Sequence, residues 1–230
     1  MITNCPYRTN CNGIDCDKDF CMKKYRLDLL YNNSLLTEDV KQVKKLFIDA
    51  DGTDYNQFQQ LAQLERSIVE FVKSGENLYL HSYICGNGKT SWAIRLLTSY
   101  INKIWPKSTL GCQALYVEVS KYLQGLKDKI SGIHDPKIDF ITQNIMEADL
   151  VVWDDIAAKG GTEFELNHLL NIINARMMQK KSNIFTTNLG KNEILKALGE
   201  RLASRICNNS IEIELQGTDK RKLGKTGGEN

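Results

Sequence analysis

The sequence is poor in proline and histidine and contains no long apolar run. Three prolines and three histidines occur among 230 residues, and no stretch approaches the roughly 18 uninterrupted apolar residues of a membrane-spanning helix. The first residues, MITNCPYRTNCNG, lack the apolar segment of a secretory signal. We therefore expect a cytoplasmic protein without a membrane partner, in a compartment where thiols stay reduced.

An excess of charge of one sign is also missing. The 30 lysines and arginines nearly balance the 28 aspartates and glutamates, which gives a formal net charge of +2. A protein that binds nucleic acid through its overall field would be strongly basic, so any contact with DNA must come from a local cluster. The length allows one full-sized domain plus a small appendage.

Cysteine is the residue whose distribution is uneven. Four of the seven cysteines lie within the first 21 residues, with five, four and four residues between them: Cys5, Cys11, Cys16 and Cys21. Four thiols this close suit a tetrahedral zinc site, although the spacing is not that of paired CxxC motifs. Free thiols and disulfides are the alternatives. A reducing compartment disfavours disulfides, and clustered free thiols would be prone to oxidation. We predict a small four-cysteine zinc-binding domain over residues 1–31.

Strand-like and helix-like segments alternate from about residue 61 onward. Four strand-like segments are separated by helical patterns: NLYLHSY, ALYVEV, DLVVWDD and NIFTTN. This alternation predicts an α/β fold with a parallel, doubly wound sheet flanked by helices. We expect this domain to span residues 61–222, after a linker with a short helix over 32–60 and before a disordered tail over 223–230.

A phosphate-binding loop is predicted where the first strand meets its helix. The segment YICGNGKT ends in the GK[ST] of a Walker A motif, although Tyr83 replaces the first glycine of the usual pattern. Glycines let backbone N–H groups curl around phosphate oxygens at a helix N-terminus. Lys89 would reach the β and γ phosphates of ATP, and Thr90 would offer its hydroxyl to Mg²⁺. The expected nucleotide-binding residues are Gly86, Asn87, Gly88, Lys89, Thr90 and Ser91. A surface turn that opens an ordinary helix is the alternative.

A second acidic motif supports the nucleotide interpretation. The apolar strand LVVWDD ends in Asp154 and Asp155, which is the Walker B pattern. Asp154 would hold Mg²⁺, and Asp155 would orient the attacking water. Acidic residues that merely end a buried strand are common, but this pair follows a phosphate loop after one intervening strand and helix.

Further motifs resemble those of AAA+ helicase loaders in the DnaC/DnaI (IstB-like) family, over roughly residues 61–222. IFTTN is similar to sensor 1, so the resemblance implies that Asn188 contacts the γ-phosphate or the water. LGERLASR is similar to the box with the arginine finger, which implies a catalytic role for Arg205 with Arg201 in support. IELQGTDKR resembles the last strand and sensor-2 arginine, here Arg221. Each motif alone has a structural alternative, such as a solvated helix face for the arginines.

The resemblance also implies the partners. The N-terminal zinc domain would dock on a replicative hexameric helicase, and the ATPase would self-associate through its ATP site and help to place that ring on single-stranded DNA. An IstB-like transposition ATPase would have nearly the same fold and site, and the cysteine cluster favours the loader. A nucleotide-binding adaptor with negligible hydrolysis is a third possibility. Slow hydrolysis of ATP, with Mg²⁺ and Zn²⁺ as metals, is expected.

A local basic segment is the candidate for DNA contact. In SKYLQGLKDKI, three lysines could neutralise phosphates and Tyr122 could stack on a base: Lys121, Lys127 and Lys129. A solvated amphipathic helix is an equally good interpretation of this segment.

Overall fold

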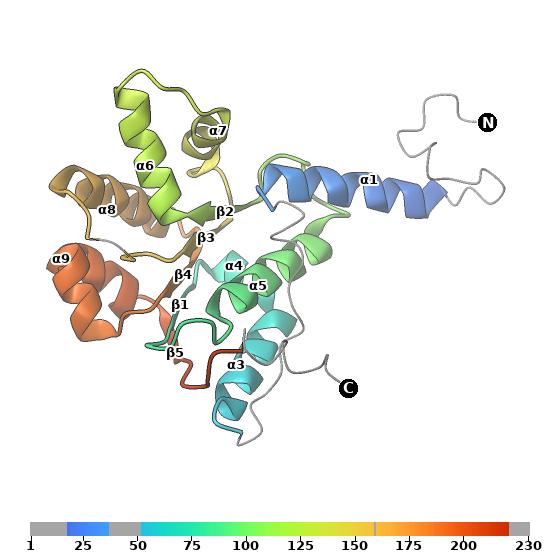
Figure 1. Ribbon diagram of the computed structural model, residues 1–230. Coiled ribbons are helices and arrows are strands. Elements are labelled where there is room, and N and C mark those ends of the chain that lie inside the picture. Colours follow the sequence, from blue (N-terminus) through green and yellow to red (C-terminus); the bar gives the residue numbers. More distant parts are fainter. Residues whose placement is uncertain (1–17, 37–51, 159, 221–230) are drawn as a thin grey trace, which may run out of the picture.

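The computed structural model describes residues 18–36, 52–158 and 160–220. Its centre is a sheet of five parallel strands in the order β2-β3-β4-β1-β5 (Figure 1). The strands are β1 (Asn77–His81), β2 (Ala114–Glu118), β3 (Leu150–Asp154), β4 (Ser182–Thr187) and β5 (Ile211–Glu214). The predicted α/β fold with a helix-flanked parallel sheet is therefore confirmed.

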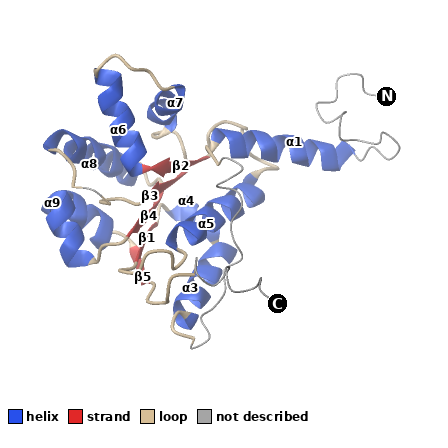
Figure 2. Cartoon of the chain, in the orientation of Figure 1, coloured by secondary structure: helices blue, strands red, loops and turns tan. Residues whose placement is uncertain are grey.

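Helices cover both faces of the sheet, as Figure 2 shows in blue around the red strands. One face carries α1 (Lys18–Asn33), α3 (Tyr55–Arg66), α4 (Ile68–Ser74) and α5 (Lys89–Ile104). The other carries α6 (Val119–Ile130), α7 (Pro136–Asn144), α8 (Glu163–Met178) and α9 (Lys191–Asn208). Successive side chains of a strand point to opposite faces, so Leu150 and Val152 join the first core while Val151 and Trp153 join the second. Strands buried on both faces explain the apolar runs in the sequence.

Local sequence signals mark several helix ends. Gly75 ends α4 in the left-handed conformation with φ 74°, which a residue without Cβ adopts at no steric cost. Thr162 and Glu165 form a capping box at the start of α8. The segment before Gly75 forms two helices rather than one, because α3 ends at Arg66 and α4 begins at Ile68, with Ser67 between them.

The first described helix is attached to the α/β domain. The Arg26 guanidinium donates from Nε to the Trp105 carbonyl at 3.1 Å and from Nη2 to the Ser108 carbonyl at 2.8 Å. Asn33 donates to the Leu110 carbonyl at 2.7 Å. Two expected domain boundaries, at residues 31 and 60, consequently fall inside helices α1 and α3. Within the described ranges, no helix is long and apolar enough to cross a membrane.

Candidate nucleotide-binding site

The Walker A loop lies between the carboxyl end of β1 and the N-terminus of α5. Gly86 and Gly88 have φ values of 79° and 108°, a region that side chains with Cβ rarely enter. The loop therefore needs glycine at both positions. Its backbone leads into the N-terminus of a 16-residue helix, where unpaired N–H groups and the helix dipole favour an anion.

Lys89 is nearly buried and is held by its own loop. Its Nζ donates to the Ile84 carbonyl at 3.1 Å and to Asn87 Oδ1 at 3.4 Å. Asn87 in turn donates to Ser82 Oγ and, at 3.2 Å, to the Leu215 carbonyl. Asn87 therefore braces the loop. To reach a phosphate, the ammonium of Lys89 would exchange these two acceptors for phosphate oxygens, which is a favourable charge-assisted contact.

Asp154 is the centre of a compact hydrogen-bond cluster. Its Oδ1 accepts from Thr90 Oγ1 at 2.9 Å and from Thr186 Oγ1 at 2.6 Å. Its Oδ2 accepts from the Tyr116 hydroxyl at 2.6 Å. Burial, and then the neighbouring Asp154 carboxylate, raise the pKa of Tyr116 well above its ordinary value, so this hydroxyl stays protonated and donates.

The Thr90 hydroxyl and Asp154 carboxylate offer the hard oxygen ligands that Mg²⁺ prefers, beside the phosphate loop. This donor set fits the metal. The structure brings these two predicted residues together, while sequence reasoning missed Tyr116 and Thr186. The pairing of the strands could have identified Thr186. Trp153 on β3 pairs with Phe185 on β4, so the next residues along these strands, Asp154 and Thr186, lie side by side.

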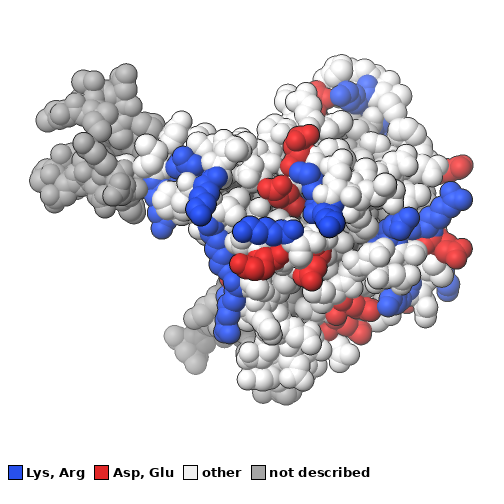
Figure 3. Space-filling model, turned by 180° about the vertical axis from the view of Figure 1, so that it is seen from behind, with Lys and Arg blue, Asp and Glu red and all other residues white. Residues whose placement is uncertain are grey.

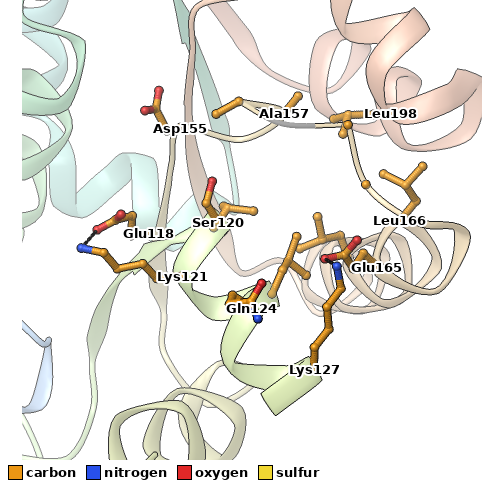
Figure 4. A pocket seen from close by; sticks show the side chains of 16 residues that line it. Glu118, Ser120, Lys121, Gln124, Lys127, Asp155, Ala157, Glu165, Leu166 and Leu198 are labelled. Atoms are coloured by element: carbon orange, nitrogen blue, oxygen red, sulfur yellow. Dashed lines mark ion pairs between the residues drawn. The ribbon is translucent and has the colours of Figure 1, made fainter. Parts of the chain in front are cut away.

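Asp155 follows β3 in a strained conformation. Its φ of 57° lies in the left-handed region, and its backbone N–H donates to Thr186 Oγ1 at 2.9 Å. Figure 4 shows its carboxylate at one end of a cavity of about 410 Å³ between α6 and the segment that leads to α8. Asn188 comes directly after β4 and is partly buried, so β1, β3 and β4 bring the expected phosphate, water and sensor residues to one edge of the sheet.

The two candidate finger arginines point outward from α9. The helix is kinked at Gly199, whose φ of 76° and ψ of 162° are not helical. After the kink Arg201 and Arg205 are exposed, while Leu202 and Ile206 are buried against the domain. This is the arrangement that their four-residue spacing predicts.

The chain after β5 wraps back over the phosphate loop. Fully buried Asp54 accepts backbone N–H bonds from Gln216 at 2.8 Å and Gly217 at 2.9 Å. Lys220 donates its N–H to the Gly86 carbonyl at 3.0 Å. Although Asp54 occupies the N-cap position of α3, its side chain does not cap that helix; it holds this distant segment instead, which sequence reasoning missed. Arg221 lies outside the described residues.

The candidate DNA contacts are only partly available. Tyr122 is fully buried, and its hydroxyl is 3.0 Å from His168 Nε2. The expectation that Tyr122 stacks on a base is therefore wrong, because its ring is part of the core on that face. The three lysines are exposed but form ion pairs. Lys121 pairs with Glu118 at 2.8 Å and Lys127 with Glu165 at 2.9 Å (Figure 4). Lys129 pairs with Asp139 at 2.5 Å. On the face drawn in Figure 3, both signs of charge are interspersed.

Only one of the four predicted zinc ligands, Cys21, lies among the described residues. Cys21 lies in α1 and is partly exposed, whereas Cys5, Cys11 and Cys16 lie outside the described residues. Within the described part of the chain, no three or more His, Cys, Asp or Glu side chains are grouped so that they could hold a metal ion. The zinc site stays a prediction.

A five-stranded parallel sheet with these motifs at one edge defines a P-loop ATPase of the AAA+ class. The chain belongs to the family of IstB-like ATP binding proteins, whose model matches residues 23–223. Among curated proteins no match was found.

Solved structures share the fold at low sequence identity. The crystal structure of the DnaC helicase loader matches with a TM-score of 0.60 and 16% identity, over 76% of this chain and 96% of that one. DnaI matches with a TM-score of 0.61 and 21% identity, over 81% and 95%. AMPPCP-bound DnaA from Aquifex aeolicus matches with a TM-score of 0.57 and 17% identity, over 82% and 54%.

Proposed function

We propose that this ATPase loads a replicative hexameric helicase onto single-stranded DNA. The observation that carries the proposal is the joint presence of an ATP site at the sheet edge and two outward arginines on α9, in a chain whose fold match extends over 95–96% of two loader chains.

Each residue of the site has a role in this proposal. Lys89 neutralises the β and γ phosphates, and Asp155 and Asn188 orient the attacking water. Thr90 and Asp154 would hold Mg²⁺, which would supply positive charge to the phosphate oxygens. Tyr116 and Thr186 keep Asp154 oriented through the bonds described above.

The ATP site would be completed by a second copy of the chain. Arg205, with Arg201 in support, would reach the nucleotide of the neighbouring protomer and stabilise negative charge that develops in the transition state. Self-association through the ATP site then links hydrolysis to assembly. ATP would act mainly as a conformational switch, with slow turnover.

The remaining contacts belong to the partners. Residues 1–31, with zinc held by Cys5, Cys11, Cys16 and Cys21, would dock on the helicase. Single-stranded DNA would be contacted by Lys121, Lys127 and Lys129 on α6, each of which would exchange a carboxylate for a phosphate. The partners of Lys121 and Lys129 are partly exposed carboxylates, and such exposed pairs are weak. Glu165, the partner of Lys127, is buried, so this lysine would exchange its partner less readily.

The family match gives the second candidate. The family is that of IstB-like ATP binding proteins. The alternative to a helicase loader is therefore an ATPase that serves a transposase on duplex DNA. A pull-down with the immobilised full-length chain distinguishes the helicase loader from the transposition ATPase. On the loader proposal, ATP-dependent capture of a hexameric replicative helicase is expected and capture of an IS21-type transposase is not. The reverse result would overturn the loader proposal, and capture of neither would favour a nucleotide-binding adaptor.

A further inference from the structure

We propose that Tyr83 is a positioning residue that couples nucleotide binding in the Walker A loop to the arginine helix α9. Tyr83 stands where the usual motif has its first glycine. Its ring is 60% exposed, so burial of the side chain does not account for its position. The position of Tyr83 is explained by the contacts of its hydroxyl group.

The Tyr83 hydroxyl lies at the first turn of α9. A hydrogen bond to Glu193 raises the pKa of Tyr83 above its ordinary value, as expected for a phenol that donates to a carboxylate. The hydroxyl end also covers Gly190 so closely that a methyl group at this position would overlap it. The same Glu193 carboxylate accepts the Gly190 N–H at 2.9 Å. Tyr83 thus contacts the two residues that form the N-terminal cap of α9.

A short path connects this contact to the phosphate site. Lys89 Nζ donates to the carbonyl of Ile84, the residue next to Tyr83. A bound nucleotide would draw Lys89 Nζ toward its β and γ phosphates, and the Ile84 carbonyl would then lose this donor. The loop at 83–84 must readjust, and Tyr83 transmits that change to the first turn of α9.

Helix α9 connects the contact of Tyr83 at its N-terminus with the two arginines near its C-terminus. A second tyrosine, Tyr79 on β1, donates to the Leu189 carbonyl at 2.6 Å, so the entry to α9 is fixed to the sheet by one tyrosine and attached to the loop by the other. The helix then continues through its kink at Gly199 to Arg201 and Arg205. Nucleotide in one protomer would therefore adjust the arginines offered to the next. This step rests on the proposed trans role of Arg205.

Two variants interrupt the contact in different ways. Tyr83→Phe removes the hydrogen bond and keeps the ring. Gly190→Ala displaces the hydroxyl end, because φ −80° and ψ 179° accept any residue and the atom in the way is the tip of a movable side chain. In a Tyr83→Ala background, Gly190→Ala should have no further effect. Tyr55→Phe is the matched control, since Tyr55 is 52% exposed on α3.

Hydrogen exchange tests the coupling without reference to the arginines. We expect Mg²⁺·ATP to change amide exchange in the first turn of α9 by about 2- to 30-fold in the parent chain and in Tyr55→Phe, the range usual for residues that carry coupling. The change should fall below about twofold in Tyr83→Phe and in Gly190→Ala. No nucleotide effect on α9 in the parent, or an equal effect in Tyr83→Phe, would overturn the proposal.

A mixing experiment tests the consequence in trans. An acceptor chain carries Arg205→Ala, and a donor chain carries Asp155→Asn, which keeps Lys89 and Arg205. Tyr83→Phe in the donor should lower the restored ATPase activity by at least about twofold, whereas the same change in the acceptor should not. An effect confined to the acceptor would overturn the coupling role. If the Arg205→Ala acceptor and the Asp155→Asn donor restore no activity with Tyr83 intact in both, Arg205 does not act on a neighbouring protomer. The hydrogen-exchange experiment would then still test whether Tyr83 couples the Walker A loop to α9.

Discussion

Replacement of Thr186 by valine isolates the hydroxyl that joins the two Walker B aspartates. Thr186 is fully buried; it donates to Asp154 at 2.6 Å and accepts the Asp155 N–H at 2.9 Å. Valine keeps the shape of the side chain and removes both bonds. The unpaired N–H of Asp155 should cost about 1–3 kcal/mol of stability. The substitution also removes the hydrogen bond that supports the strained backbone of Asp155, whose φ is 57°. The Asp155 carboxylate should therefore lose its orientation.

The expected catalytic loss follows from the same geometry. Residues that orient a metal ligand typically change activity by ~10–100-fold when replaced, which corresponds to about 1.4–2.7 kcal/mol in the activation barrier. We expect kcat to fall by this factor and the Mg²⁺ requirement to rise, with little change in the affinity for a fluorescent ATP analogue. Steady-state ATPase assays over a Mg²⁺ titration measure both.

Thr187→Val is the matched control for this prediction. Thr187 is equally buried in the same strand, but its hydroxyl accepts a longer 3.3 Å bond from the Leu189 N–H. Its replacement should leave kcat within about twofold of the parent, because exposed or long bonds contribute little. If Thr186→Val also stays within that limit, the orientation of the two aspartates does not depend on Thr186, and the reasoning is refuted.

Four further outcomes are expected. Lys89→Ala should reduce ATP affinity or turnover sharply in a nucleotide-binding and ATPase assay; undiminished activity would contradict the phosphate-loop assignment. Protein purified without chelator should contain about one zinc per chain by elemental analysis, and chelation should leave ATP binding largely intact; absence of zinc would exclude the four-cysteine site. The isolated monomer should hydrolyse ATP slowly, because Asp155 is one methylene shorter than glutamate and positions water less well; fast single-chain turnover would argue against this. Arg205→Ala should bind ATP without hydrolysing it or forming ATP-dependent oligomers, and a Lys89→Ala partner should restore some activity; parental behaviour of Arg205→Ala would refute a shared site.

The sheet and the ATP site were predictable because short motifs mark them. Apolar strands followed by polar residues place Lys89, Asp154 and Asn188 at the carboxyl ends of β1, β3 and β4. In a parallel sheet these ends share one edge, so the site follows once the strands are recognised. Capping at Thr162 and the stop at Gly75 were equally local signals.

The missed features depend on contacts between distant segments. Asp54 reads as a helix N-cap, yet it holds the backbone at residues 216–217. Tyr122 reads as a surface aromatic between lysines, yet the fold turns it into the core beneath His168. Arg176 carries no sequence signal, yet it is fully buried and donates to three backbone carbonyls and to Asn183. Burial lowers its pKa to about 9.

The burial pattern of α9 supports the proposal that its arginines act on another protomer. Leu202 is 2% exposed and Ile206 is 0% exposed, and they form a stripe on α9 next to that of the exposed Arg201 and Arg205. Rotation of the helix to turn the arginines inward would expose both apolar side chains, at a cost of about 1.5–3 kcal/mol each. That cost is comparable with the ~4–7 kcal/mol that a finger worth a factor of ~10³–10⁵ supplies, so an inward turn would forfeit much of the gain. On the proposed shared site, the nucleotide of a neighbouring chain would meet the outward arginines without this cost, so assembly would be the more favourable route to a complete ATP site.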